Sequence, residues 1–173
     1  MEFYAWARTQ PRGRFERAGG LVVAMSPEQY GHTRVKYCVT KALEAALAAV
    51  GSSCVAVPEG ATVEIDEDTD YEPDASIHCG GPIPRESLMV PNPVVVVEVI
   101  SLSSRRIDTQ VKRDMYFRVP SIQHYLVVQA DRREVTHYGR GEGDRARLAG
   151  VLTGGRVTLE PPGITVAVED FYT

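Results

Sequence analysis

The chain has 173 residues, enough for one domain with a buried core. Apolar residues make up 43% and charged residues 24% of it, an ordinary composition for a globular protein. The formal net charge of −4 gives no global electrostatic reason to expect nucleic-acid binding, although a local basic patch stays compatible with it. Apolar runs fall short of the roughly 20 residues that a membrane-spanning helix needs, and residues 1–20 lack the apolar centre of a signal peptide. We therefore expect a cytoplasmic protein without a membrane partner.

The N-terminal half of the chain shows one long helix among several short strands. Apolar residues recur at helical spacing from about Glu28 to Val50, after the helix-start sequence Ser26-Pro27-Glu28 and before Gly51. Residues 1–10 are either a short helix or an irregular arm. The strands predicted here from alternation and turn residues are 15–17, 21–25, 54–57, 62–65 and 75–78.

Several potentially reactive side chains in this half are expected to have structural roles. Residues 64–70 hold five acids but lack the glycine and closing glutamate of an EF-hand, which favours a solvated acidic turn. Cys38, Cys54 and Cys79 are widely spaced and form no C-x-x-C pair. We expect all three to be free, buried thiols in a reducing cytoplasm. His32 shows no metal-ligand spacing, so a capping or packing role on the long helix is expected.

The strand predicted at Pro93–Ile100 is the one around which the chain is organised. Four valines, a glutamate and two more aliphatic residues make it apolar on both faces, which indicates a central strand covered on both sides. Alternation places Glu98 on one face with Val96 and Ile100. A buried carboxylate is costly unless it is paired, hydrogen-bonded or bound to a metal. We therefore expect a partner for Glu98.

A second, shorter helix follows, from about Asp108 to Arg118. Asp108, Lys112 and Tyr116 share one stripe of it at spacings of four residues. The adjacent stripe, which we expect to pack on the sheet, consists of Ile107, Val111 and Met115.

The remainder of the chain alternates like a series of strands, with Phe171 and Tyr172 as a C-terminal anchor. The predicted strands are 123–130, 134–140, 146–152, 156–159 and 164–168. Strands arranged around one early and one late helix predict an α+β (mixed α/β) domain with one curved sheet flanked by helices.

Two acids and a lysine suggest a site. Asp74 follows Pro73 at the start of a predicted strand, so it converges with Glu98 if the two strands are neighbours. Two hard oxygen ligands suit Mg²⁺, which promotes attack on phosphate esters. Lys112 could direct its ammonium toward them and orient water or a phosphate oxygen. From these residues alone, a turn aspartate and a surface Asp108–Lys112 pair remain alternatives.

The order of these motifs resembles the Uma2 family (domain of unknown function 820) of restriction-endonuclease-like proteins. The resemblance covers about residues 15–172. It implies one Uma2-like nuclease domain over residues 1–173, with residues 1–14 as an N-terminal arm and a central curved mixed sheet flanked by helices. The matching segments are Pro73-Asp74, Pro93 to Ser101, Asp108, Lys112, Tyr116 and Ser121 to Val128, with Glu16, Gly19-Gly20, Met25-Ser26-Pro27 and His32 upstream.

The resemblance also implies the chemistry of the PD-(D/E)xK nuclease superfamily, which is metal-dependent hydrolysis of phosphodiester bonds. By position, Asp74 and Glu98 would hold Mg²⁺, with Mn²⁺ as an alternative. The superfamily lysine, two residues after the glutamate, would fall at Ile100 in this chain and is absent, so Lys112 is assigned as its replacement. Glu16 would add a further acid to the catalytic set.

DNA is the expected partner. Residues 101–120 carry five basic and two acidic side chains, a local charge of +3. Arg105, Arg106 and Arg113 are candidates for contacts with DNA phosphates, and a solvated helix end is the alternative. We expect a homodimer, because duplex cleavage needs two cuts. The alternatives to a DNA endonuclease are a catalytically silent nuclease-fold module that binds DNA or protein, and a metal phosphodiesterase for small substrates.

Overall fold

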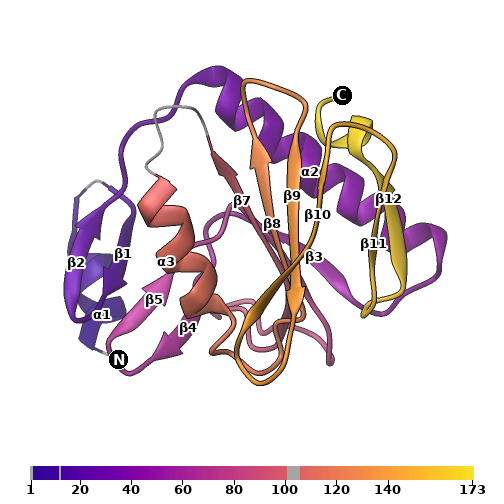
Figure 1. Cartoon of the computed structure of the whole chain (residues 1–173). Helices are drawn as coiled ribbons and strands as arrows, with labels where there is room; N and C mark the ends of the chain where they lie inside the picture. The colour runs from indigo at the N-terminus through magenta and orange to yellow at the C-terminus, as the bar shows by residue number, and fades with distance from the viewer. Residues whose placement is uncertain (1, 12, 101–105) are drawn as a thin grey trace.

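The central sheet is built around β7 (Pro93–Ile100), the apolar strand predicted from the sequence. The computed structural model describes residues 2–11, 13–100 and 106–173. The other strands of this six-stranded sheet are β3 (Val55–Pro58), β6 (Ala75–His78), β8 (His124–Gln129), β9 (Val135–Arg140) and β10 (Ala146–Leu152). Their order is β10-β9-β8-β7-β6-β3, with β7 parallel to β8 and antiparallel to β6 (Figure 1). The predicted mixed sheet is confirmed.

Helices cover both faces of this sheet (Figure 1). On one face α2 (Tyr30–Ala49) packs against a core that includes Val95 and Val97. On the other face α3 (Arg106–Tyr116) contributes to a second core, which includes Val96. Side chains alternate along β7, so a strand that is apolar at every position but Glu98 supplies both cores. Among the described residues, none of the helices has the length and apolar character required to cross a membrane.

Helix α2 begins later than predicted. Gln29 precedes it in an extended conformation (φ −76°, ψ 149°) and makes no side-chain capping hydrogen bond. The carboxylate of Glu28 instead accepts a hydrogen bond from Lys36. Residues 26–28 therefore lie outside the helix. The other end agrees with the prediction, because Gly51 follows the helix with a φ of 63°, a conformation that favours glycine.

The packing face of α3 was predicted correctly for Met115, which packs against the second core, but wrongly for Val111. Val111 is half-exposed, whereas Tyr116 and Phe117 are fully buried and Lys112 is partly buried. The stripe that carries Lys112 and Tyr116 thus turns toward the sheet, because Tyr116 fills the core beside Tyr125. The side chains of Ile107 and Asp108 lie outside the described residues.

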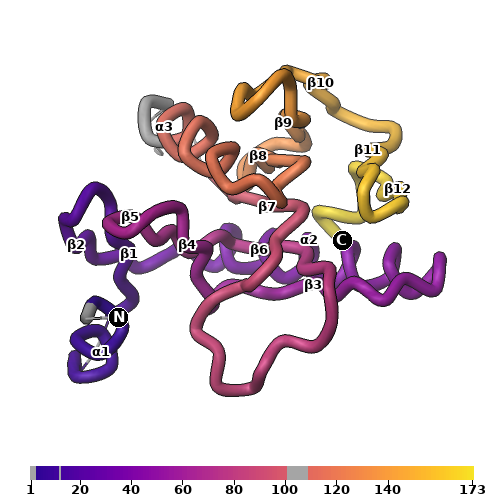
Figure 2. The backbone as a smooth tube through the Cα atoms, turned by 90° about the horizontal axis from the view of Figure 1, so that it is seen from below, coloured from indigo at the N-terminus to yellow at the C-terminus, as the bar shows by residue number. Residues whose placement is uncertain are grey.

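The single predicted sheet is in fact divided. A separate four-stranded sheet has the order β2-β1-β5-β4. Its strands are β1 (Phe15–Ala18), β2 (Leu21–Ala24), β4 (Val63–Asp66) and β5 (Thr69–Tyr71). The N-terminal helix α1 (Glu2–Thr9) packs beside it, so of the two alternatives for this segment the helix is confirmed over residues 2–9. Figure 2 shows this unit beside the central sheet.

The predicted acidic turn is the β4–β5 hairpin. Asp70 is fully buried there. Its carboxylate accepts a hydrogen bond of 2.7 Å from the Tyr4 hydroxyl and pairs at 2.7 Å with the Arg17 guanidinium. The other four acids of the turn are exposed or partly exposed, as expected, so the prediction of a solvated turn is wrong only for Asp70. Its partners come from segments more than 50 residues away along the chain.

The C-terminal anchor is confirmed. The hairpin of β11 (Arg156–Leu159) and β12 (Ile164–Ala167) leads into the short helix η1 (Val168–Phe171). Phe171 is fully buried in the core on the α2 side. Figure 2 shows β12 and the C-terminus next to α2.

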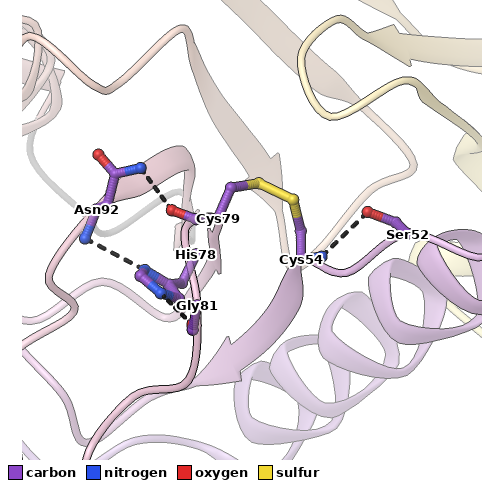
Figure 3. The surroundings of a disulfide bond; sticks show 6 residues. All are labelled: Ser52, Cys54, His78, Cys79, Gly81 and Asn92. Carbon is purple, nitrogen blue, oxygen red and sulfur yellow. Dashed lines mark hydrogen bonds between the residues drawn. A yellow bond between two sulfur atoms is a disulfide. The ribbon is translucent and has the colours of Figure 1, made fainter.

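The cysteine prediction is wrong for two of the three residues. Cys54 and Cys79 form a disulfide with a Cα–Cα distance of 4.4 Å (Figure 3). They flank the antiparallel β3–β6 pair, in which Val55 lies opposite His78. Strand pairing therefore brings the two cysteines face to face, which no local spacing predicts. Cys38 is free and buried, as expected. The cytoplasmic location stays a prediction.

This bridge is expected to stabilise the fold. It joins residues 25 positions apart, and closing a loop of that length in the unfolded chain is worth about 3 kcal/mol. A Cys54→Ser/Cys79→Ser variant should therefore lose about that much free energy of unfolding in urea titrations. Reductant should lower the stability of the parent but not of the double variant. Equal stabilities of parent and variant under oxidising conditions would contradict the prediction.

Candidate active site

All four residues predicted for catalysis line one cleft of about 740 Å³. Glu16 comes from β1, Asp74 from the residue before β6, Glu98 from β7 and Lys112 from α3. Residues 23–29 and the first turn of α2 form part of its wall. The cleft thus collects side chains that lie up to 96 residues apart along the chain.

Glu98 has the partners that its buried position requires. Its Oε1 accepts a hydrogen bond of 2.9 Å from the Tyr116 hydroxyl and lies 3.4 Å from Lys112 Nζ. Lys112 Nζ also donates to Glu16 Oε1 at 2.8 Å. Glu16 in turn accepts a hydrogen bond of 2.9 Å from the backbone amide of Glu72. One ammonium therefore bridges two carboxylates on the wall of the cleft.

Burial and charge crowding change the acidity of this group. Burial raises the pKa of Glu98 to about 8; Asp74 and Glu16 add to the rise, and Lys112 and the Tyr116 hydroxyl oppose it. Burial, together with the charge of Glu98, raises the pKa of the Tyr116 hydroxyl well above its ordinary value. The hydroxyl therefore stays protonated and remains a donor to Glu98.

The raised pKa predicts how stability varies with pH. The folded protein holds the Glu98 proton up to about pH 8, whereas the unfolded chain releases it near 4.5. The stability that the retained Glu98 proton gives to the folded state is fully present below pH 4.5 and is lost as the pH rises through about 8. Relative to Glu98→Gln, which cannot ionise, the parent should lose a few kcal/mol of unfolding free energy across this range. Urea titrations in EDTA measure it, and parallel pH profiles of the two proteins would contradict it.

Asp74 lies where the prediction required. Strands β6 and β7 are neighbours, and Asp74 directly precedes β6. Its Oδ2 accepts a hydrogen bond of 2.6 Å from the backbone amide of Val99, and its Oδ1 pairs at 2.6 Å with Lys36 Nζ. Burial raises the pKa of Asp74, and Lys36 and the Val99 amide oppose that rise. Asp74 and Glu98 are thus held by different lysines.

Lys36 is the residue that sequence reasoning missed. Its side chain is only 4% exposed, and Nζ binds one oxygen from each of three carboxylates, those of Glu28, Glu59 and Asp74. Burial lowers its pKa, but the three acids raise it above its ordinary value, so the ammonium stays charged. The sequence did contain a signal for it, because Lys36 lies three residues before Val39 on the apolar face of α2, where a lysine needs a buried partner.

These three carboxylates are close enough together to hold a metal ion, with oxygens within 4.8 Å of one another. The Lys36 ammonium already binds all of them, so it supplies the positive charge that a cation would provide. We therefore assign Glu28, Glu59 and Lys36 to the support of Asp74 and not to a separate metal site.

The structure places the other residues that the sequence singled out in different surroundings. His32 Nε2 makes a hydrogen bond of 2.6 Å with the carbonyl oxygen of Val99, which joins α2 to the end of β7 in the expected packing role. Arg113 pairs with Asp114 at 2.7 Å and stacks over the Tyr138 ring, away from the cleft-lining residues. Arg105 and the side chain of Arg106 lie outside the described residues.

A mixed sheet covered by helices on both faces, with acids and lysines gathered in a cleft at the end of its central strand, defines a restriction-endonuclease-like fold. The chain belongs to the Uma2 family, described as "Putative restriction endonuclease", whose model matches residues 1–169. The uncharacterized protein slr1290 of Synechocystis sp. is 24% identical over 172 residues, covering 99% of this chain and 89% of its own. A crystal structure of a "putative nuclease belonging to DUF820" from Anabaena variabilis is similar in fold. It matches with a TM-score of 0.68 and 15% identity over 91% of this chain and 89% of that one.

Proposed function

We propose that this protein is a metal-dependent DNA endonuclease that hydrolyses phosphodiester bonds. The observation that carries the proposal is the buried Glu98 carboxylate, which shares one cleft with Asp74, Glu16 and the Lys112 ammonium. Membership of a family described as putative restriction endonucleases supports it. Cleavage of DNA and the identity of the catalytic residues are our inference from this arrangement.

The donor set fits a magnesium or manganese ion. The cleft presents carboxylate oxygens, the ligands that such hard cations prefer. Burial raises the pKa of Glu98, and the nearby Asp74 and Glu16 carboxylates add to the rise; this gathering of acids supports the assignment of a cation site. We assign Asp74 and Glu98 as the residues that would hold the ion. When bound, it would supply charge stabilisation at the phosphate that is attacked.

The chain's own residues prepare the site for that chemistry. Tyr116 fixes one oxygen of Glu98, and the Val99 amide with Lys36 fixes both oxygens of Asp74. Lys112 Nζ lies between Glu16 and Glu98, where it can hold a phosphate oxygen or orient a water for in-line attack. Each functional group is thereby positioned before the substrate arrives.

Incubation of the purified protein with supercoiled plasmid and Mg²⁺ or Mn²⁺ tests the proposal. We expect nicked or linear DNA from the parent, none in EDTA and none from Glu98→Ala. Glu142→Ala, which removes an exposed acid on the turn between β9 and β10, is the matched control and should cleave like the parent. Absence of cleavage would favour a catalytically silent module. Hydrolysis of a small chromogenic phosphodiester without DNA cleavage would favour a small-substrate enzyme.

We also propose that two copies associate through β2. This edge strand is uncharged, and Leu21, Val22 and Val23 are 73%, 46% and 48% exposed. Edge strands usually carry charges, prolines or bulges that prevent pairing. Among the other described edges of the four- and six-stranded sheets, β4 bears two acids and an irregular register, β10 is also irregular in register and carries an arginine, and β3 ends in proline. Antiparallel pairing of β2 with its copy is self-complementary and would bring two clefts together for duplex cleavage.

Light scattering tests this association. The parent should have the mass of a dimer, and Val22→Lys should have that of a monomer because a lysine would be buried in the paired edge. Val151→Lys, at a valine that is 56% exposed on β10, is the control and should stay dimeric. A monomeric parent, or a dimeric Val22→Lys variant, would contradict the proposed interface.

A further inference from the structure

The outer face of α2 carries a stripe of aromatic and basic side chains. Tyr30, Arg34, Tyr37 and Lys41 recur at spacings of four, three and four residues, which places them on one side of the helix. All four are exposed, and the two tyrosines are 83% and 58% exposed. Apolar packing does not explain them, because the buried face of α2 is formed by other residues.

The stripe carries two cations, Arg34 and Lys41. Arg34 and Lys41 form no ion pair with any acid in the described part of the chain, although the chain as a whole has a net charge of −4. The Arg34 guanidinium instead lies 5.3 Å from the centroid of the Tyr37 ring. This cation–π contact couples the Arg34 charge to the Tyr37 ring.

The stripe begins at the mouth of the cleft. Gln29, Gly31 and His32 line the cleft, and Tyr30 lies among them on the first turn of α2. From Tyr30 to Lys41 the stripe extends about 16 Å along the helix. From there α2 continues toward β12, away from the end of β7 (Figure 1).

We propose that this stripe binds an unpaired strand of the DNA substrate where it leaves the cleft. The proposal rests on the proposed function and names the form of DNA that the site receives. Tyrosine rings stack on exposed bases, and interleaved cations contact the phosphates between them, which is the usual way in which proteins hold single strands. An apolar protein surface fits less well, because it would cover the Arg34 and Lys41 charges without pairing them.

Fluorescence anisotropy of a labelled 20-nucleotide single strand, in EDTA to prevent cleavage, tests the proposal. We expect Tyr30→Ala and Tyr37→Ala each to weaken binding by about 5- to 100-fold, the effect of losing one stacked base. Tyr37→Phe keeps the ring and should bind like the parent. Arg34→Gln should reduce the slope of log affinity against log salt by about 0.7. Arg145→Gln is the charge-matched control, since it removes an exposed arginine from the turn at the opposite end of the sheet and should leave binding unchanged.

In this experiment, circular dichroism is used to check that each variant is folded. Parent-like binding by the Tyr30→Ala/Tyr37→Ala double variant, or no binding by the parent, would overturn the proposal. So would loss of the dimer in Tyr37→Ala with DNA binding retained, because the stripe would then be a protein contact. Binding that depends on the stripe without any plasmid cleavage would support this inference while the nuclease proposal fails. Plasmid cleavage by the parent, together with DNA binding that does not depend on the stripe, would support the nuclease proposal and overturn this inference.

Discussion

Replacing Lys112 by alanine is expected to slow plasmid cleavage by about 100- to 10,000-fold, the usual effect of losing a positioned proton-transfer or water-orienting group. The ammonium lies 2.8 Å from Glu16 Oε1 and 3.4 Å from Glu98 Oε1 and is the lysine nearest the two oxygens of that pair. Without it, Glu16 and Glu98 would lose the ammonium that lies between them. Quantitative nicking assays at saturating Mg²⁺ measure the loss.

Comparison with Glu98→Gln separates the two roles. We expect Lys112→Ala to retain Mn²⁺ binding by calorimetry, because the lysine is not a ligand, and Glu98→Gln to lose it. Arg113→Ala, at the next position of α3 but paired with Asp114, is the control and should cleave within a few fold of the parent if its outward pairing is its main role. Full activity in Lys112→Ala would refute the lysine assignment and leave the metal-site assignment unaffected.

Replacing Lys36 by methionine is expected to destabilise the fold by about 3–5 kcal/mol, the usual cost of removing one partner of a buried ion pair. Lys36 is the cation shared by Glu28, Glu59 and Asp74, and Asp74 is almost as buried as Lys36 itself. Methionine keeps most of the apolar stem, so the loss reports the missing charge and not a cavity. Urea titration of parent and variant at pH 7 measures it.

The pH dependence of this loss identifies its cause. Without Lys36 the carboxylates bind protons more tightly in the folded state, so the variant should regain stability as the pH falls. The difference between parent and variant should therefore shrink toward pH 4. Lys41→Met, on the exposed side of the same helix, should change stability by less than about 0.5 kcal/mol. A difference that is constant with pH would indicate lost packing in place of lost charge.

Local patterns were sufficient for most of the elements, although they missed the short strand β5. The composition of β7 indicated a strand buried on both faces, and the periodicity of α2 indicated a long amphipathic helix, because both depend on residues that are neighbours in the chain. The turn at Gly19-Gly20 likewise specified the β1–β2 hairpin. The buried Glu98 pointed to the site, since a carboxylate in such a strand needs a partner wherever the rest of the chain lies.

Long-range pairing decided what local patterns could not. The Cys54–Cys79 bridge depends on the register of β3 against β6, and the burial of Asp70 depends on Arg17 from another strand. In the sequence, Lys36 is only one polar residue on an apolar helix face. The fold gives it a role, because the start of β6 brings Asp74 against it. In each case the free energy comes from burying a polar group beside its complement, and only the folded chain brings the two together.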